Sequence, residues 1–190
     1  LGFLQDQLHR GANDLLLALG YNHHESFGSY TTWNAEYGRT LSRALRATLA
    51  AGTAYRAPDS TDLYGYGGNP ALQPETSHQL QLGLAWQAAA SQELRVSLYE
   101  NRINDLIEYV LIDPATFTYQ AQNAARARIR GAELDYEWRG AAWSAHGSFV
   151  AQDPRNLTTG TQLLRRAHSN LALGARYDAG ALNASADLQL

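Results

Sequence analysis

The stretch GTAYRAPDSTDLYGYGGNPALQPETS, residues 52–77, decides how the rest of the sequence is interpreted. It contains four glycines, three prolines and three tyrosines. Proline removes a backbone donor, and Gly and Asn tolerate positive φ, so this composition predicts a long loop of successive turns. The segments on either side alternate apolar and polar residues, which indicates a loop that joins two strands.

Alternation with a period of two is the main signal along the whole chain. In residues 45–56, for example, Leu45 and Leu49 share one face while Arg46 lies on the other. A helical stripe would need a spacing of about 3.6 residues, and these windows lack it. The pattern predicts about ten strands, with approximate bounds 1–8, 14–22, 30–38, 45–56, 77–87, 93–111, 118–139, 142–152, 168–178 and 181–190.

The connections between these strands are of two kinds that alternate in order. RGAND, GRTLSRA, QAAASQ, RGA and DAG are short turns, whereas residues 22–29, 57–76, 113–117 and 153–167 are mostly longer or richer in special residues. Short turns at one end of an antiparallel meander and long loops at the other are typical of outer-membrane barrels. We therefore expect an all-β antiparallel meander forming about ten strands of a transmembrane β-barrel.

Aromatic residues support this interpretation. Those within a few residues of a short turn, on the apolar face of their strands, are Tyr37, Trp86, Trp138, Trp143 and Tyr177. Tyr21 and Tyr55 lie at the opposite strand ends. Such residues form girdles at the two membrane interfaces of a barrel. The alternative is a soluble β-sandwich, in which Leu82, Leu84, Leu134 and Phe149 would be enclosed in a dry core instead of facing lipid.

The two longest strands, residues 93–111 and 118–139, exceed the roughly 9–11 residues of a tilted span. Arg128 and Arg130 share a face with Leu134, and an arginine in mid-bilayer costs about 2–4 kcal/mol. We therefore expect the upper hairpin to project into water, with a bulge near Gly131. The carboxylates that then point into the polar lumen are Glu133, Asp135 and Glu137.

The composition disfavours several classes of function. The chain has no cysteine, and its net charge is -3 with no basic run, so we expect no thiolate chemistry and no nucleic-acid partner. The six histidines show no metal-binding spacing, and the lumenal acidic ladder is explained more simply by a water-filled pore than by glycoside hydrolysis. We expect neither a metal, a cofactor nor a catalytic site.

Ligand contacts are expected from the long loops. Tyr64 and Tyr66 offer flat amphipathic surface in the 57–76 loop, although they could equally pack that loop together. Arg165 and Arg166 lie where the outer loop of residues 153–167 rejoins the barrel wall, where an arginine can donate to amide or phosphate oxygens or form a salt bridge.

Several segments resemble the TonB-dependent outer-membrane receptors. The first is the opening stretch with its YRAP and GNPALQPETS segments, and the others are YENRINDLIEYV, residues 99–110, NAARARIRGAELDYEW, residues 123–138, and TQLLRRAHSN, residues 161–170. The order and spacing are most similar to the branch of the family that transports cobalamin, vitamin B12.

This resemblance implies a receptor of the bacterial outer membrane, surrounded by lipid, that imports cobalamin or a similar bulky ligand without chemical turnover. It implies a 22-stranded barrel and a plug domain that contacts TonB. Residues 1–190 would be a partial barrel domain, with the plug domain and closing strands absent. Of the family's ligand contacts, only Arg165 is carried over; Tyr64 and Tyr66 rest on loop chemistry alone. A siderophore or haem receptor is the alternative within the family, and a soluble β-sandwich binding module is the alternative outside it.

Overall fold

The computed structural model describes residues 1–163 and 166–190, with the backbone alone at residues 124 and 125. Its strands are β1 (Gly2–Arg10), β2 (Asn13–His24), β3 (Gly28–Ser42), β4 (Leu45–Arg56), β5 (Glu75–Ala89), β6 (Gln92–Asp113), β7 (Thr118–Arg139), β8 (Trp143–Asn156), β9 (Ser169–Ala179) and β10 (Leu182–Gln189), and one helix, α1 (Ser60–Tyr64), lies between β4 and β5. None of the helical structure in the described residues is long and apolar enough to cross a membrane.

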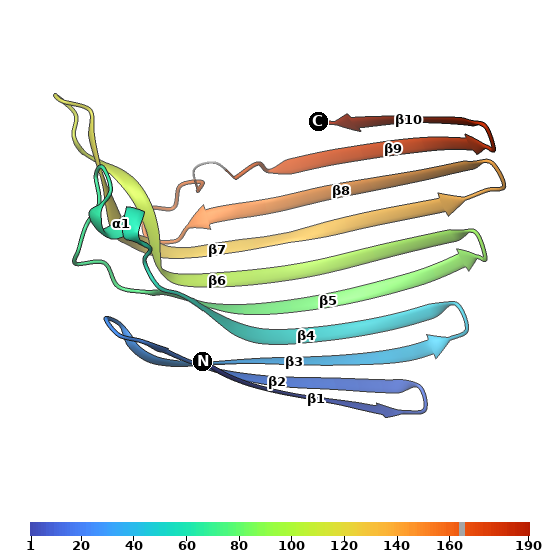
Figure 1. Cartoon of the computed structure of the whole chain (residues 1–190), viewed down its shortest axis with the longest axis horizontal. Coiled ribbons are helices and arrows are strands. Elements are labelled where there is room, and N and C mark those ends of the chain that lie inside the picture. The colour runs from blue at the N-terminus through green and yellow to red at the C-terminus, as the bar shows by residue number, and fades with distance from the viewer. Residues whose placement is uncertain (164–165) are drawn as a thin grey trace.

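The ten strands form one sheet in sequence order, and each strand pairs antiparallel with the next (Figure 1). The turns after β1, β3, β5, β7 and β9 lie at one end of the sheet, and the longer connections with α1 lie at the other (Figure 1). This confirms the expected antiparallel meander. A sandwich needs two packed sheets, so that alternative is wrong for the described part of the chain.

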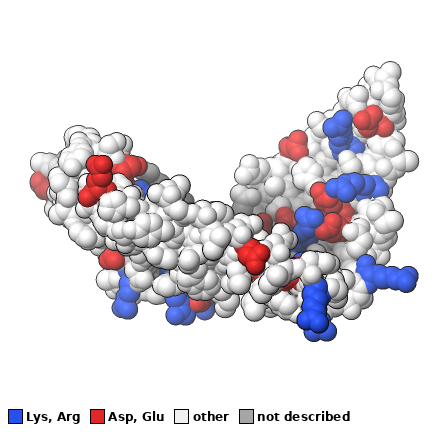
Figure 2. Space-filling model, turned by 60° about the horizontal axis from the view of Figure 1, so that its bottom comes forward, with Lys and Arg blue, Asp and Glu red and all other residues white. Residues whose placement is uncertain are grey.

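The described residues of the sheet form no dry core along most of its length. The four apolar side chains that distinguish a barrel from a sandwich are all solvent-accessible, with exposed fractions of 48% for Leu82, 45% for Leu84, 42% for Leu134 and 43% for Phe149. Figure 2 shows the molecule bent around a hollow, with a wide surface that carries neither acidic nor basic groups. An exposed apolar face of this extent is expected of a wall that contacts lipid tails.

Aromatic side chains gather at the short-turn end, as expected. Trp86 is paired with Leu94, close to the β5–β6 turn, and Trp143 is paired with Tyr177 across β8 and β9, with ring centroids 4.7 Å apart. At the loop end, Tyr21 is half exposed, but Tyr55 stacks on Tyr30 at a centroid distance of 3.8 Å and its hydroxyl is buried. Tyr55 thus lies at the loop end with its ring against a second tyrosine, and its place in an outer girdle stays a prediction.

The β6–β7 hairpin is the longest feature, with 22 residues in each strand, and it extends beyond its neighbours (Figure 1). The expected bulge near Gly131 is wrong, because Gly131 pairs in unbroken register with Tyr99 and Gln152. The register shifts instead between Ile103 and Ile107, where Asp105 has φ 56°. The Tyr99 hydroxyl donates to Gln152 Oε1 at 3.1 Å across Gly131, so the small residue leaves room for an aromatic ring.

Strand β8 is also longer than expected and ends at Asn156 instead of residue 152. Its last residues pair with the upper part of β7, where Arg130 lies opposite Asp153 and Ala127 lies opposite Asn156. Pairing with the upper part of β7 thus extends β8, and Pro154 does not interrupt this pairing.

Candidate ligand-binding site

The loop of residues 57–74, here called the mouth loop, is more ordered than its composition suggests. The predicted succession of turns contains the short helix α1, which begins with a reciprocal cap. Asp59 Oδ1 accepts from the amides of Thr61 and Asp62, both at 2.8 Å, and Asp62 Oδ2 accepts from the Asp59 amide at 3.2 Å. A capping box satisfies donors that the first turn of a helix leaves unpaired, so even five residues form a stable turn here.

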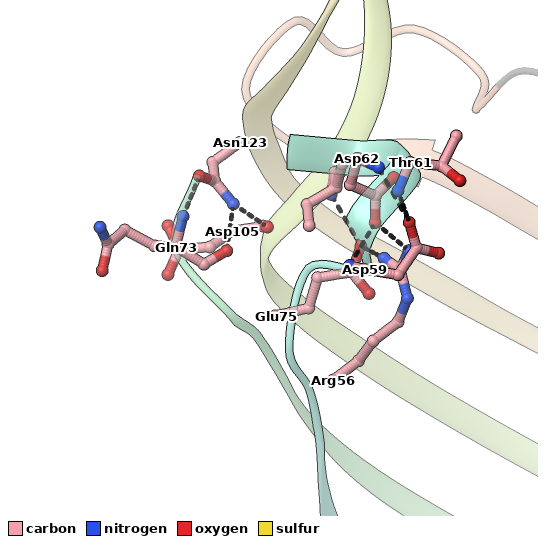
Figure 3. A network of polar contacts seen from close by, with 9 residues as sticks. Arg56, Asp59, Thr61, Asp62, Gln73, Glu75, Asp105 and Asn123 are labelled. Atoms are coloured by element: carbon pink, nitrogen blue, oxygen red, sulfur yellow. Dashed lines mark hydrogen bonds and ion pairs between the residues drawn. The ribbon is translucent and has the colours of Figure 1, made fainter. Parts of the chain in front are cut away.

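Asp62 also anchors α1 to the barrel wall through Arg56, the last residue of β4. The guanidinium of Arg56 donates to Asp62 Oδ2 at 2.6 Å and to Glu75 Oε1 at 2.9 Å (Figure 3). Glu75 Oε1 in turn accepts from the Ile107 amide at 2.8 Å. These contacts join β4, α1, β5 and β6 at one point, so the mouth loop leaves and rejoins the sheet in a defined direction.

A second attachment joins the mouth loop to the β6–β7 hairpin through Asn123. Its Oδ1 accepts from the Gln73 amide at 2.8 Å, while its Nδ2 donates to the carbonyls of Gln73 at 2.8 Å and Asp105 at 2.7 Å (Figure 3). The Asn123 side-chain amide therefore both donates to and accepts from the backbone of Gln73, as a paired strand residue does. It also donates to the irregular backbone at Asp105.

Two hydrogen bonds with the backbone of Ala121 complete the docking of the mouth loop. The Ala121 amide donates to the Gly67 carbonyl at 2.7 Å, and Asn69 Nδ2 donates to the Ala121 carbonyl at 3.1 Å. The buried apolar residues among those described are Leu72, Ala121, Ala127 and Leu163, and they come from the mouth loop, the hairpin and the connection after β8. This part of the chain thus builds its dry interior at the loop end.

Beside this small core lies a cleft of about 700 Å³. Its aromatic and charged lining consists of Tyr66, Tyr109, Tyr119, Glu108 and Arg166. The apolar lining consists of Ile103, Leu106, Ile107, Ile129 and Leu163. Its size lies within the range of small-molecule sites, and a mainly apolar lining with a few polar groups is their usual character. The arrangement suits a bulky ligand with flat apolar parts and exposed hydrogen-bonding groups.

The three residues expected to bind ligand lie in different situations. Tyr66 lines the cleft and is otherwise exposed, with an exposed fraction of 94%. Tyr64 is also exposed, at 76%, but it is not among the residues that line the cleft. Arg165 lies outside the described residues, whereas its neighbour Arg166 lines the cleft and its carbonyl accepts from Gln162 Nε2 at 2.8 Å.

The sequence interpretation did not include Tyr109, Tyr119 and Glu108 among the site residues. All three lie in the projecting hairpin beyond Asp105. Residues of both parities line the cleft there, Tyr109 with Ile107 and Glu108 with Leu106, so alternation along the strand does not mark them. The sequence did hold one signal, because Tyr109 and Tyr119 flank the turn of the hairpin. In the structure, Tyr109 pairs with Ala121 and Tyr119 pairs with Leu111.

Electrostatics at the tip of the hairpin favour an ionised Asp113. The Thr116 hydroxyl donates to its Oδ2 at 2.6 Å and the Ala115 amide donates to its Oδ1 at 2.9 Å. These hydrogen bonds, the one from Thr116 above all, lower the pKa of Asp113 below its ordinary value. Among the residues that the structure describes, no three His, Asp or Glu side chains gather as a metal ion would require.

Comparison with known proteins identifies the family. The model of the TonB dependent receptor-like β-barrel matches residues 1–189. The chain belongs to this family of TonB-dependent receptors, whose members are integral outer-membrane β-barrels and transport receptors.

Solved structures with the same fold include two receptors of different cargo. The ferric enterobactin receptor PfeA from Pseudomonas aeruginosa superposes with a TM-score of 0.81 at 18% identity, covering 98% of this chain and 31% of the receptor. The copper transporter OprC gives a TM-score of 0.76 at 19% identity, covering 94% of this chain and 33% of the transporter. The chain thus spans about a third of the length of these proteins.

Proposed function

We propose that this chain is part of the barrel of an outer-membrane receptor that binds a bulky ligand at its outer mouth and imports it with energy relayed by TonB. The observation that carries the proposal is the cleft between the mouth loop and the β6–β7 hairpin, with Tyr66, Tyr109 and Tyr119 beside Arg166. Tyrosine rings supply flat contact area, and arginine donates several hydrogen bonds to ligand oxygens.

The unpaired edges of the sheet support the rest of the architecture. Strands β1 and β10 each pair with a single neighbour and are exposed along their whole length. Barrels close so that no strand edge faces lipid. We therefore propose that residues 1–190 form a partial barrel domain, closed by further strands and filled by a plug domain that contacts TonB. Transport then follows from rearrangement of the plug once the mouth is occupied.

For the ligand, we propose cobalamin, because the segments around the cleft resemble those of the cobalamin branch and a corrin carries both a flat ring and many amide oxygens. A ferric siderophore is the rival ligand, and the fold is shared with the enterobactin receptor named above. Titration of the purified receptor that contains this chain, with cyanocobalamin and with ferric enterobactin, decides between them. Micromolar or tighter binding of cobalamin alone is expected, whereas tight binding of the ferric siderophore alone would reassign the cargo.

The role of the tyrosines is tested by a matched pair of substitutions. Tyr66→Ala removes a ring from the cleft, and we expect ligand affinity to fall about tenfold, equivalent to about 1.4 kcal/mol. Tyr64→Ala removes the same ring from an exposed position two residues away in the same loop and should leave affinity within about twofold. Equal losses in both variants would show that the tyrosines act by holding the loop together.

The two adjacent arginines are separated in the same way. Arg166→Ala should weaken binding because Arg166 lines the cleft. The contribution of Arg165 stays a prediction from the family resemblance, and Arg165→Ala measured in parallel assigns it. Unchanged affinity in Arg165→Ala would make that residue part of the wall instead of the site.

A further inference from the structure

The outward face of strands β6, β7 and β8 carries a charged pattern that the ligand site does not use. The register aligns Arg102, Arg128 and Arg155 side by side on the three strands, here called the arginine row. The next row toward the short turns consists of Glu100, Arg130 and Asp153, and the one after it consists of Leu98, Ala132 and Ala151. Like charges directly opposite one another destabilise a sheet, so three adjacent arginines need a compensating partner.

The acidic residues of this face compensate only part of the charge. Asp153 lies 2.8 Å from Arg155, 3.3 Å from Arg130 and 3.7 Å from Arg128, so one carboxylate serves three guanidinium groups. Glu100 pairs with Arg102 at 2.7 Å. In these two rows, four arginines against two carboxylates leave a local charge of +2, in a chain whose net charge is -3. Among the described residues, the buried Nε of Arg128 has no hydrogen-bond partner.

An apolar groove of about 770 Å³ borders these charges on the same face. It is lined by Leu80, Leu82 and Leu98 on its apolar side, and by Glu100, Arg130 and Asp153 at its charged end. The leucines belong to the surface that faces lipid tails, since each is about half exposed. The groove therefore runs from the lipid-facing wall directly into the charged rows.

The height of the arginine row matches the level of lipid headgroups. Ten residues separate Trp138, in the girdle of the short-turn end, from Arg128. At about 3.4 Å per residue and a strand tilt of about 40°, this distance is about 26 Å along the membrane normal. The apolar band of such barrels is about 25 Å tall. The arginine row thus lies where the headgroup phosphates of the opposite leaflet begin.

We propose that the arginine row binds the phosphate of an anionic lipid headgroup while an acyl chain of the same lipid lies in the groove below. Guanidinium groups match phosphate oxygens in bidentate geometry, and all 15 basic residues of this chain are arginines. The groove favours a lipid over a free anion, because only a lipid fills the apolar part. Among the described residues, the groove and the ligand cleft share no lining residue, so the two sites are separate.

The test uses the purified receptor that contains this chain, titrated in detergent with dioctanoyl phosphatidylglycerol, with dioctanoyl phosphatidylcholine and with inorganic phosphate. Native mass spectrometry counts the adducts. We expect the anionic lipid to bind at least tenfold more tightly than the zwitterionic lipid, and inorganic phosphate not to displace it at equal concentration. Equal binding of the two lipids would overturn the proposal, and displacement by free phosphate would show an anion site without a lipid role.

Two sets of variants locate the site. Combining Arg102→Gln, Arg128→Gln and Arg155→Gln should lower affinity for the anionic lipid at least tenfold. A control with the same change of charge at the short-turn end, Arg43→Gln with Arg139→Gln and Arg176→Gln, should change it less than threefold. Equal losses in both triple variants would reduce the effect to net charge and refute a specific site.

A variant expected to bind the lipid more tightly distinguishes an effect on the site from an effect of misfolding. Glu100→Gln removes the carboxylate paired with Arg102, so the freed guanidinium should bind the anionic lipid severalfold more tightly. Unfolding does not produce tighter binding, so an unchanged or weaker affinity in a folded Glu100→Gln protein would contradict the proposal. Ligand affinity at the mouth should be unaffected in every variant, which separates failure of this inference from failure of the proposed transport function.

Discussion

At the scale of single residues, the ligand site depends on a few backbone positions of unusual geometry. Gly67 has φ 71°, and a Cβ at this position would lie 2.4 Å from the Tyr119 carbonyl oxygen. Glycine therefore serves two purposes here, since it permits the left-handed conformation and allows the mouth loop to approach the hairpin closely. Tyr66 reaches the cleft because the next residue brings the loop against β7.

Substitution of this glycine should loosen the mouth loop. Gly67→Ala combines backbone strain with a collision against Tyr119, so we expect faster amide exchange at Ala121 and at least tenfold weaker ligand binding. Gly160→Ala is the control, because Gly160 has φ 75° with nothing within 4 Å of the added Cβ. It should cost only the strain of positive φ, about 1 kcal/mol. Matching effects of the two variants on ligand affinity would contradict a role for the close approach.

At the scale of elements, the mouth loop and the β6–β7 hairpin behave as one unit because side chains replace the missing strand pairing. Arg56 connects three elements, and Asn123 contacts both Asp105 and Gln73, the latter fifty residues away in the sequence. Among the described residues, few apolar side chains are buried at this junction. Polar contacts with defined geometry therefore determine where the loop docks.

Removal of the Asn123 side chain should undock the loop from the hairpin. Asn123→Ala deletes three hydrogen bonds, and with about 1 kcal/mol per bond we expect docking to weaken by about 1–3 kcal/mol. Hydrogen exchange of the Gln73 and Ala121 amides measures this loss. Gln122→Ala, at the neighbouring position of β7, is the control and should leave both amides protected. Retained protection in Asn123→Ala would show that the hydrogen bonds of Gly67 and Asn69 with Ala121 suffice.

Acid should destabilise the tip of the hairpin through Asp113. Its pKa is lowered in the folded protein by the Thr116 and Ala115 donors, so ionisation of Asp113 stabilises the tip above the ordinary aspartate pKa of about 3.9. This contribution is lost as the pH falls through the lowered folded pKa. Amide exchange or NMR shifts of Ala115, followed from pH 6 downward, should show loosening only below pH 4. Asp113→Asn should abolish this dependence, and its persistence in that variant would assign it to another group.

At the scale of the whole molecule, the sheet separates two environments. Its outward face presents exposed Leu82, Leu84, Leu134 and Phe149, while residues of opposite parity carry carboxylates such as Asp135 on the other face. The membrane defines which face is outside, because apolar side chains that would be buried in a soluble protein face lipid here.

Neighbouring residues of β8 should therefore respond oppositely to the same substitution. Phe149→Arg places a charge on the lipid face and should destabilise the receptor by about 2–4 kcal/mol near the middle of the bilayer. Ser148→Arg places it on the lumenal face, opposite Asp135, and should be nearly neutral. Urea unfolding of the receptor in lipid vesicles measures both. Equal destabilisation would mean that both faces of the strand meet the same environment.

The features that could be predicted from the sequence are those that depend on local repetition. Alternation with a period of two, the ten strands, the opposite placement of turns and loops and the aromatic residues near the turns follow from the pleat of a strand and from the chemistry of membrane interfaces. The candidacy of Tyr66 came from the flat amphipathic surface of a tyrosine in a long loop; the residue is exposed at the mouth, and its role in ligand binding stays a prediction.

Tertiary structure alone decided which residues meet at the mouth. The cleft takes residues of both parities from the hairpin, such as Tyr109 and Glu108, and no period in the sequence marks them. The contact of Asn123 with Gln73 joins β7 to a loop residue fifty positions away in the sequence. Neighbouring residues in the sequence determine whether a residue forms a strand. The pairings between all the strands determine which other residues that strand meets.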